Sequence, residues 1–137
     1  MPKITREEVR VPADVMPEAR DEYITNYLKA TRETGRLMLF ACDQKIEHLN
    51  KDFYGEGIDI ADLDPEHLFK IGSEGVCGVL AGQRGLVAQY AADYPEINYL
   101  IKMNSKTNLV GTKQEDPYSP QLYDLDAVLA MKEAGVN

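Results

Sequence analysis

"LFACDQKIEHLNKDFYG" (residues 39–55) begins with apolar residues and turns within a few letters into charged and polar ones. The preceding letters extend its apolar part to "RLMLFACD" (residues 36–43), which is short and shows no alternation of polar and apolar residues. Such a run is typical of a strand that is covered on both faces, as in a parallel sheet. Asp43 therefore stands where a buried strand is expected to end.

Two more apolar runs predict strands, and helical patterns separate them. The expected strands are "VCGVLAG" (residues 76–82) and "NYLIKMN" (residues 98–104). The expected helices lie in "DPEHLFKIGSEG" (residues 64–75), "QRGLVAQYAADYP" (residues 83–95) and "LYDLDAVLAMKEAG" (residues 122–135). A further helix is expected over residues 16–35, because Pro17 suits a first turn and Gly35 suits the position after the last.

This order of elements predicts an α/β fold with right-handed βαβ units and a parallel sheet. It is typical of the amino-terminal part of a (β/α)8 TIM barrel, which takes roughly 250 residues when complete. We therefore expect an irregular N-terminal arm over residues 1–16 and an incomplete TIM-barrel domain over residues 17–137. A small flavodoxin-like sheet is the alternative, whereas a dinucleotide site is disfavoured because no glycine-rich turn follows Asp43.

The composition excludes several classes of function. The chain of 137 residues is 44% hydrophobic and 28% charged, with a formal net charge of −8. No segment concentrates Lys and Arg, so we expect no nucleic-acid partner. No apolar stretch approaches the roughly 20 residues of a membrane span, so we expect no membrane partner either.

The two cysteines and the N-terminus favour a cytoplasmic protein. Cys42 and Cys77 lie far apart in apolar runs, which fits free thiols in a reducing compartment rather than a disulfide or a metal site. The first 20 residues are charged and contain no apolar core of a signal peptide.

Reactive groups in parallel barrels lie at the carboxyl ends of the strands. This rule selects Asp43 after the first strand, Gln83 and Arg84 after the second, and Lys102 and Asn104 in and after the third, with Lys106 next to them. Gln44 and Lys45 follow Asp43 and are expected to face the same open end of the barrel, at the carboxyl ends of the strands. Arg84, at the start of a helix, is suited either to binding an anion or to a structural ion pair.

Asp43 and Lys102 are the candidate catalytic residues. A carboxylate next to a lysine suits proton transfer or the binding of a substrate hydroxyl, although Asp43 could also be a simple cap after its strand. Lys102 lies in an apolar strand, where an ammonium is rarely buried without a reason. It could lose its proton and attack a carbonyl, stay charged and orient a phosphate, or extend to the rim as an ordinary side chain.

A metal site is the main rival hypothesis from the residues. Asp43, Glu47 and His48 could ligate a metal ion in a hydrolase or lyase, but no second His stands at ligand spacing. Loss of activity on chelation would favour that hypothesis.

Three strand motifs carry a resemblance to a known family. "LFACDQKIEHLNKDF", "GVLAGQRGLVAQY" and "YLIKMNSKTNLVG" resemble the first three strand motifs of the archaeal-type class I fructose-bisphosphate aldolases, with related Schiff-base aldolases and aminodeoxyheptulosonate synthases. The resemblance runs from about residue 35 to the end of the sequence. It departs from the usual pattern after Asp43, where Gln44 and Lys45 stand in place of His and Gly.

The resemblance implies specific roles. It makes Asp43 the first-strand aspartate that contacts substrate hydroxyls, Lys102 the third-strand lysine near the substrate, and Gln83 and Arg84 part of the second-strand turn. It places the Schiff-base lysine on a sixth strand and an acid/base tyrosine after the third helix, and neither position exists among these 137 residues.

The resemblance also implies a substrate, a chemistry and partners. The expected substrate is a phosphorylated ketose such as fructose 1,6-bisphosphate, cleaved through an iminium ion without a metal or other cofactor. Without the Schiff-base lysine, we expect the 137-residue chain alone to be nearly inactive. Its open sheet edge predicts a homo-oligomer or association with a chain that completes the barrel. A catalytically inactive protein that binds sugar phosphates or a longer aldolase is the other alternative.

Overall fold

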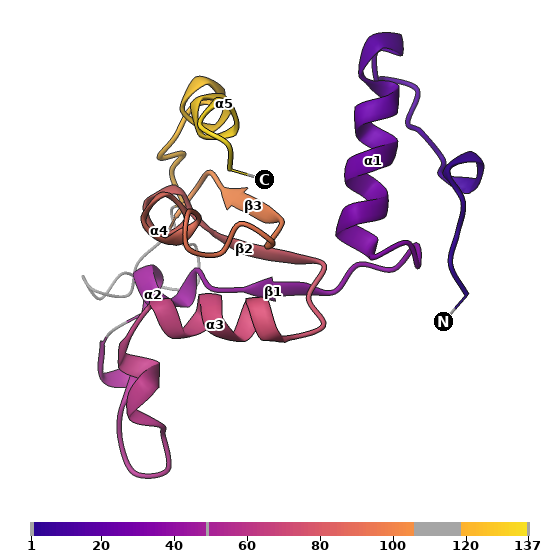
Figure 1. The fold of residues 1–137 in the computed structure, drawn as a ribbon. Helices are drawn as coiled ribbons and strands as arrows, with labels where there is room; N and C mark the ends of the chain where they lie inside the picture. Colours follow the sequence, from indigo (N-terminus) through magenta and orange to yellow (C-terminus); the bar gives the residue numbers. More distant parts are fainter. Residues whose placement is uncertain (1, 49, 106–118, 137) are drawn as a thin grey trace.

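The computed structural model describes residues 2–48, 50–105 and 119–136, in which helices follow a first helix and separate the three strands (Figure 1). The helices are α1 (Arg20–Thr31), α2 (Gln44–Glu47), α3 (Glu66–Glu74), α4 (Arg84–Tyr90) and α5 (Leu125–Glu133). The strands are β1 (Leu39–Ala41), β2 (Val79–Gln83) and β3 (Tyr99–Lys102). Short 3-10 turns are η1 (Arg6–Glu8), η2 (Pro17–Ala19), η3 (Asn50–Phe53) and η4 (Ile60–Leu63). Among the described residues, no helix combines the length and apolar character needed to cross a membrane.

The three strands form one parallel sheet in the order β1-β2-β3. Ala41 pairs with Ala81, and Gln83 pairs with Lys102. The parallel α/β prediction is confirmed. In a flavodoxin-like sheet the first strand lies between the second and the third, so that alternative is wrong. Consecutive neighbours are what the early strands of a barrel require.

One face of the sheet is covered and the other is open. The covered face packs into a cluster that includes Cys42, Leu80 and Phe69 of α3, all fully buried. On the opposite face, Leu39 and Leu100 keep 41% and 43% of their surface exposed. The expectation that the strands are buried on both faces is therefore wrong for β1 and β3, to which these two leucines belong. The reason is that the apolar runs describe the inner face of a barrel, and the described residues do not close one.

This open face predicts the solution behaviour of the 137-residue chain. Leu39, Leu100 and the exposed Leu37 and Met38 next to β1 offer apolar surface to a partner. We expect the chain to enhance the fluorescence of the dye ANS and to elute in gel filtration above its mass of 15.4 kDa. A monomeric chain that does not enhance ANS fluorescence would contradict this prediction.

The helix expected over residues 16–35 is shorter than predicted. α1 ends at Thr31 because Arg32 adopts the left-handed conformation (φ 51°) and Glu33 follows it (φ 61°). The N–H of Glu33 donates to the carbonyl of Leu28 at 2.8 Å, which closes the helix end four residues before Gly35. The expected start holds, since Pro17 lies in the η2 turn that leads directly into α1.

Candidate active site

Three predicted residues meet at the carboxyl edge of the sheet. Gln83 ends β2 and Lys102 ends β3, and the two are register partners, so their side chains share one face. Asp43 lies two residues after Ala41, which pairs with Ala81 on that same face. Strand geometry alone therefore brings side chains from three separate segments to one place.

The short helix α2 adds a second carboxylate. The backbone N–H groups of Ile46 and Glu47 donate to the Asp43 carbonyl at 3.0 and 3.2 Å, so the chain turns into a helix directly after the strand. Residues four apart lie on the same helix face. This helical turn places Glu47 on the same side of the chain as Asp43, and the Glu47 side chain is buried.

Lys102 lies between these carboxylates. Its Nζ donates to Asp43 Oδ2 at 2.7 Å and to Glu47 Oε1 at 2.6 Å. Ser105 Oγ donates to the same Glu47 oxygen at 3.0 Å, and Gln83 Nε2 donates to Ser105 Oγ at 2.8 Å. Distances near 2.7 Å are those of charge-assisted hydrogen bonds. The residues form one connected polar cluster, named here the lysine cluster: Asp43, Glu47, Gln83, Lys102 and Ser105.

The lysine cluster keeps Lys102 protonated. Burial acts to lower the pKa of Lys102, but the hydrogen bonds and negative charges of Asp43 and Glu47 outweigh burial and raise that pKa above its usual 10.5. A neutral amine would be needed for attack on a carbonyl. The geometry therefore favours the charged, orienting role for Lys102 over the nucleophilic role.

Comparison with known proteins now defines the family. The sequence pattern of the DeoC/LacD family of aldolases matches residues 37–136, which is most of the chain. The chain belongs to the DeoC/LacD aldolase family. This confirms the resemblance that the three strand motifs carry.

Two relatives are longer than this chain. It is 51% identical over 132 residues to the fructose-bisphosphate aldolase/6-deoxy-5-ketofructose 1-phosphate synthase of Methanocaldococcus jannaschii, covering 96% of this chain and 42% of the relative. The solved fructose-bisphosphate aldolase of Slackia heliotrinireducens is 75% identical, with a TM-score of 0.92, and the match covers 99% of this chain and 43% of that one. The chain thus spans less than half the length of either aldolase.

The remaining predicted residues of this aldolase-family chain do not join the lysine cluster. Gln44 is exposed, and Lys45 donates to the backbone carbonyl of Asp62 and lies 3.9 Å from the centre of the Phe53 ring. Arg84 Nε donates to the Ala127 carbonyl on α5 at 3.4 Å, which is a structural contact but not the expected ion pair.

Asn104 is exposed and donates through Nδ2 to Ser119 Oγ at 3.1 Å, so it too lies outside the lysine cluster. The predicted substrate contact Lys106 lies outside the described residues.

The rival metal site is not assembled. Lys102 Nζ fills the position between Asp43 and Glu47, and its positive charge opposes a cation there. His48 is exposed, and its Nδ1 lies 3.5 Å from Asp52 Oδ2. Within residues 2–48, 50–105 and 119–136, no three His, Cys, Asp or Glu side chains are grouped to hold a metal ion.

Two members of the lysine cluster were missed by sequence reasoning. The sequence suggests Glu47 only as a metal ligand, although its spacing of four from Asp43, just after a strand, is a signal for a one-turn helix with both carboxylates on one side. Ser105 carries no such signal. It follows β3 by three residues, and its contact with Glu47 depends on how the chain leaves the strand.

Proposed function

We propose that the lysine cluster is one part of the active site of a class I, Schiff-base aldolase that cleaves a phosphorylated ketose such as fructose 1,6-bisphosphate. The observation that carries this proposal is the Lys102 ammonium held at 2.7 and 2.6 Å from two carboxylates at the carboxyl edge of the sheet. Membership of the DeoC/LacD aldolase family and the names of the two relatives support it.

The residues of the cluster suit recognition of a sugar. Lys102 has three N–H donors, of which two are engaged by carboxylates of the described residues. The third is suited to a substrate hydroxyl or phosphate oxygen. Asp43 uses Oδ2 for Lys102, and its second oxygen is suited to accept a hydrogen bond from a substrate hydroxyl.

The carbon–carbon cleavage step needs a different lysine. An amine must add to the ketone and lose water to give an iminium ion, which takes up the electron pair left when the bond breaks. Because its pKa is raised, Lys102 does not suit this nucleophilic role. We therefore propose that the Schiff base forms on a lysine outside these 137 residues, and that the isolated chain is nearly inactive.

A chimaera tests this proposal. We would join the 137-residue chain to the part of the Slackia heliotrinireducens aldolase that it does not cover, since the two share 75% identity. We expect the chimaera to cleave fructose 1,6-bisphosphate, and borohydride to trap the substrate on a lysine from the Slackia part. Lys102→Met in the chimaera should lower kcat/KM by about 100-fold, the scale of a group that orients or protonates substrate.

The 137-residue chain alone is the matched control. It should give neither cleavage nor a trapped adduct. Trapping of the adduct on Lys102, or full activity of the Lys102→Met chimaera, would overturn the proposed roles. A folded chimaera whose cleavage is lost on chelation rather than on borohydride treatment would favour a metal-dependent enzyme.

A further inference from the structure

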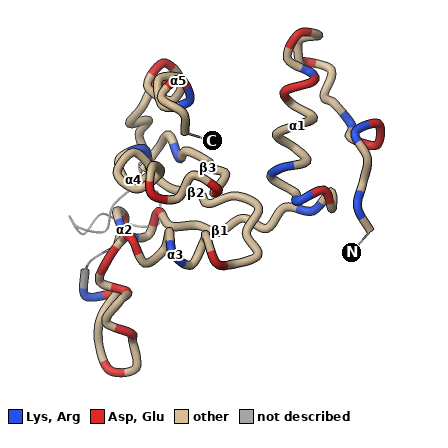
Figure 2. The backbone as a smooth tube through the Cα atoms, in the orientation of Figure 1, with Lys and Arg blue, Asp and Glu red and all other residues tan. Residues whose placement is uncertain are grey.

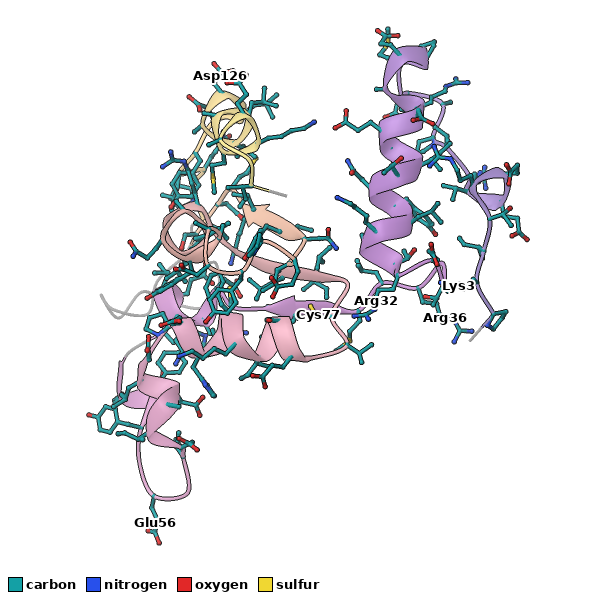
Figure 3. All side chains as sticks on the ribbon, in the orientation of Figure 1. Lys3, Arg32, Arg36, Glu56, Cys77 and Asp126 are labelled. Carbon is teal, nitrogen blue, oxygen red and sulfur yellow. The ribbon has the colours of Figure 1, made fainter. Side chains whose placement is uncertain are left out.

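A hollow of about 630 Å³ lies between the N-terminal arm and α1, away from the lysine cluster. Four of its lining side chains are basic, and one is acidic: Lys3, Arg6, Lys29, Arg32 and Glu33. We name this place the basic hollow. The wall therefore carries a local excess of positive charge in a chain whose formal net charge is −8. Figure 2 shows blue segments on both the arm and α1, and Figure 3 places Lys3 and Arg32 near the same end of that helix.

Two of the cations are held in place by neighbours. Arg6 donates to Thr25 Oγ1 at 3.1 Å and forms an ion pair with Asp21, so its guanidinium is fixed against α1. Lys3 forms an ion pair with Glu33. The arm is tied to the helix end by the Ile4 N–H, which donates to the Glu33 carbonyl at 2.7 Å. The hollow is therefore built by the packing of two segments.

The other two cations have no carboxylate partner among the described residues. Lys29 is exposed on α1, and Arg32 reaches only the backbone carbonyl of Cys77, at 3.5 Å. Both lie at the C-terminal end of α1. Their charge remains available to an external anion.

The backbone at this end of α1 adopts a left-handed conformation at two successive residues that line the hollow. Arg32 and Glu33 are successive non-glycine residues with positive φ, at 51° and 61°. Each such residue costs about 1 kcal/mol or more relative to a right-handed conformation. This turn sets the directions of both side chains, and both line the hollow.

We propose that the basic hollow binds a small polyanion of the phosphate type. A guanidinium offers a planar fork for two phosphate oxygens, and an ammonium adds a point charge. Arg32 contacts Cys77, just before β2, whereas Lys102 lies at the opposite ends of the strands. β2 has five residues and spans roughly 16 Å, so this is a second site, independent of the proposed aldolase chemistry.

Titration of the 137-residue chain with inorganic pyrophosphate at low ionic strength, followed by backbone-amide NMR and calorimetry, tests the proposal. We expect shifts at Lys29, Arg32 and Glu33, and binding weakened at least about tenfold when Lys29→Gln and Arg32→Gln are combined. Lys70→Gln is the matched control, because Lys70 is an exposed lysine on α3, outside the hollow. Binding should also weaken with added salt.

Several results would overturn the proposal. They are absence of binding at millimolar pyrophosphate, equal loss in the Lys70→Gln control, and unchanged binding in the double variant. Loss of binding in Lys102→Met but not in the double variant would assign the anion to the lysine cluster instead. If the double variant fails to fold by circular dichroism, Lys29→Gln alone takes its place, with a loss of several-fold expected.

Discussion

Replacing Lys102 with Met should lower the free energy of unfolding by about 2–3 kcal/mol. The change leaves Asp43 and the buried Glu47 next to each other without their shared cation. Breaking a fully buried pair by removing one partner costs about 3–5 kcal/mol, and the 27% exposure of the Lys102 side chain reduces that cost. Urea unfolding followed by circular dichroism measures the difference.

Lys70→Met is the matched control for this prediction. Lys70 Nζ lies 3.6 Å from Glu66 on the surface of α3, and an exposed pair four residues apart contributes about 0.3–0.5 kcal/mol. A loss for Lys102→Met no larger than that of the control would mean that the lysine cluster is not held together in solution as described.

The pH dependence of the same variant provides a second check. The folded-state pKa of Lys102 is raised above 10.5, so the stability that this lysine contributes is complete below that value and is lost as the pH rises through the folded pKa. The gap between the parent chain and Lys102→Met should therefore be widest near neutrality and should close in strongly alkaline buffer. A gap that is constant with pH would contradict the ion-pair explanation.

Gly78→Ala should be equally damaging, for a steric reason. A Cβ at Gly78 would lie 1.9 Å from the Ala30 carbonyl oxygen in the last turns of α1, and 3.2 Å from the Met38 carbonyl oxygen. Both atoms belong to the backbone and cannot rotate away, so α1 must move from the sheet. We expect a loss of about 3 kcal/mol in the free energy of unfolding, at the upper end of overpacking effects.

Gly85→Ala provides the control for a glycine with open space around it. Nothing lies within 4 Å of a Cβ at Gly85, which is in the first turn of α4. Alanine in a helix is favoured over glycine by about 0.5–1 kcal/mol, so this variant should be neutral or slightly more stable. Similar losses at the two positions would mean that α1 does not approach Gly78 closely.

The sheet was predictable because short apolar runs bounded by turn residues leave few alternatives. β2, the central strand, lies where an apolar run predicts it, but it begins at Val79 rather than at residue 76 and includes Gln83; it is buried along most of its length. The end of α1 was not predictable, because nothing in the residue types of Arg32 and Glu33 signals a left-handed turn. In this turn the carbonyl of Glu33 accepts a hydrogen bond from the Ile4 N–H of the N-terminal arm at 2.7 Å, a contact that the sequence does not signal.

The site was predictable to the extent that strand register determines it. Asp43, Gln83 and Lys102 follow from the rule that parallel strands end at the same edge, and the structure brings them into one cluster. The position of Lys45, two residues after Asp43, predicts a side chain at the same end of the sheet. The one-turn helix α2 carries its side chain away toward Asp62 and Phe53 instead.

The single helical turn between Asp43 and Glu47 has a consequence for how this segment can diverge. A helix rotates by about 100° per residue, so inserting or deleting one residue between Asp43 and Glu47 would rotate the Glu47 side chain by roughly a quarter of a turn away from Lys102. Substitution at Gln44 or Ile46 should disturb the lysine cluster less, since both side chains are exposed. We therefore expect the spacing between Asp43 and Glu47 to matter more for the lysine cluster than the identity of the exposed residues between them.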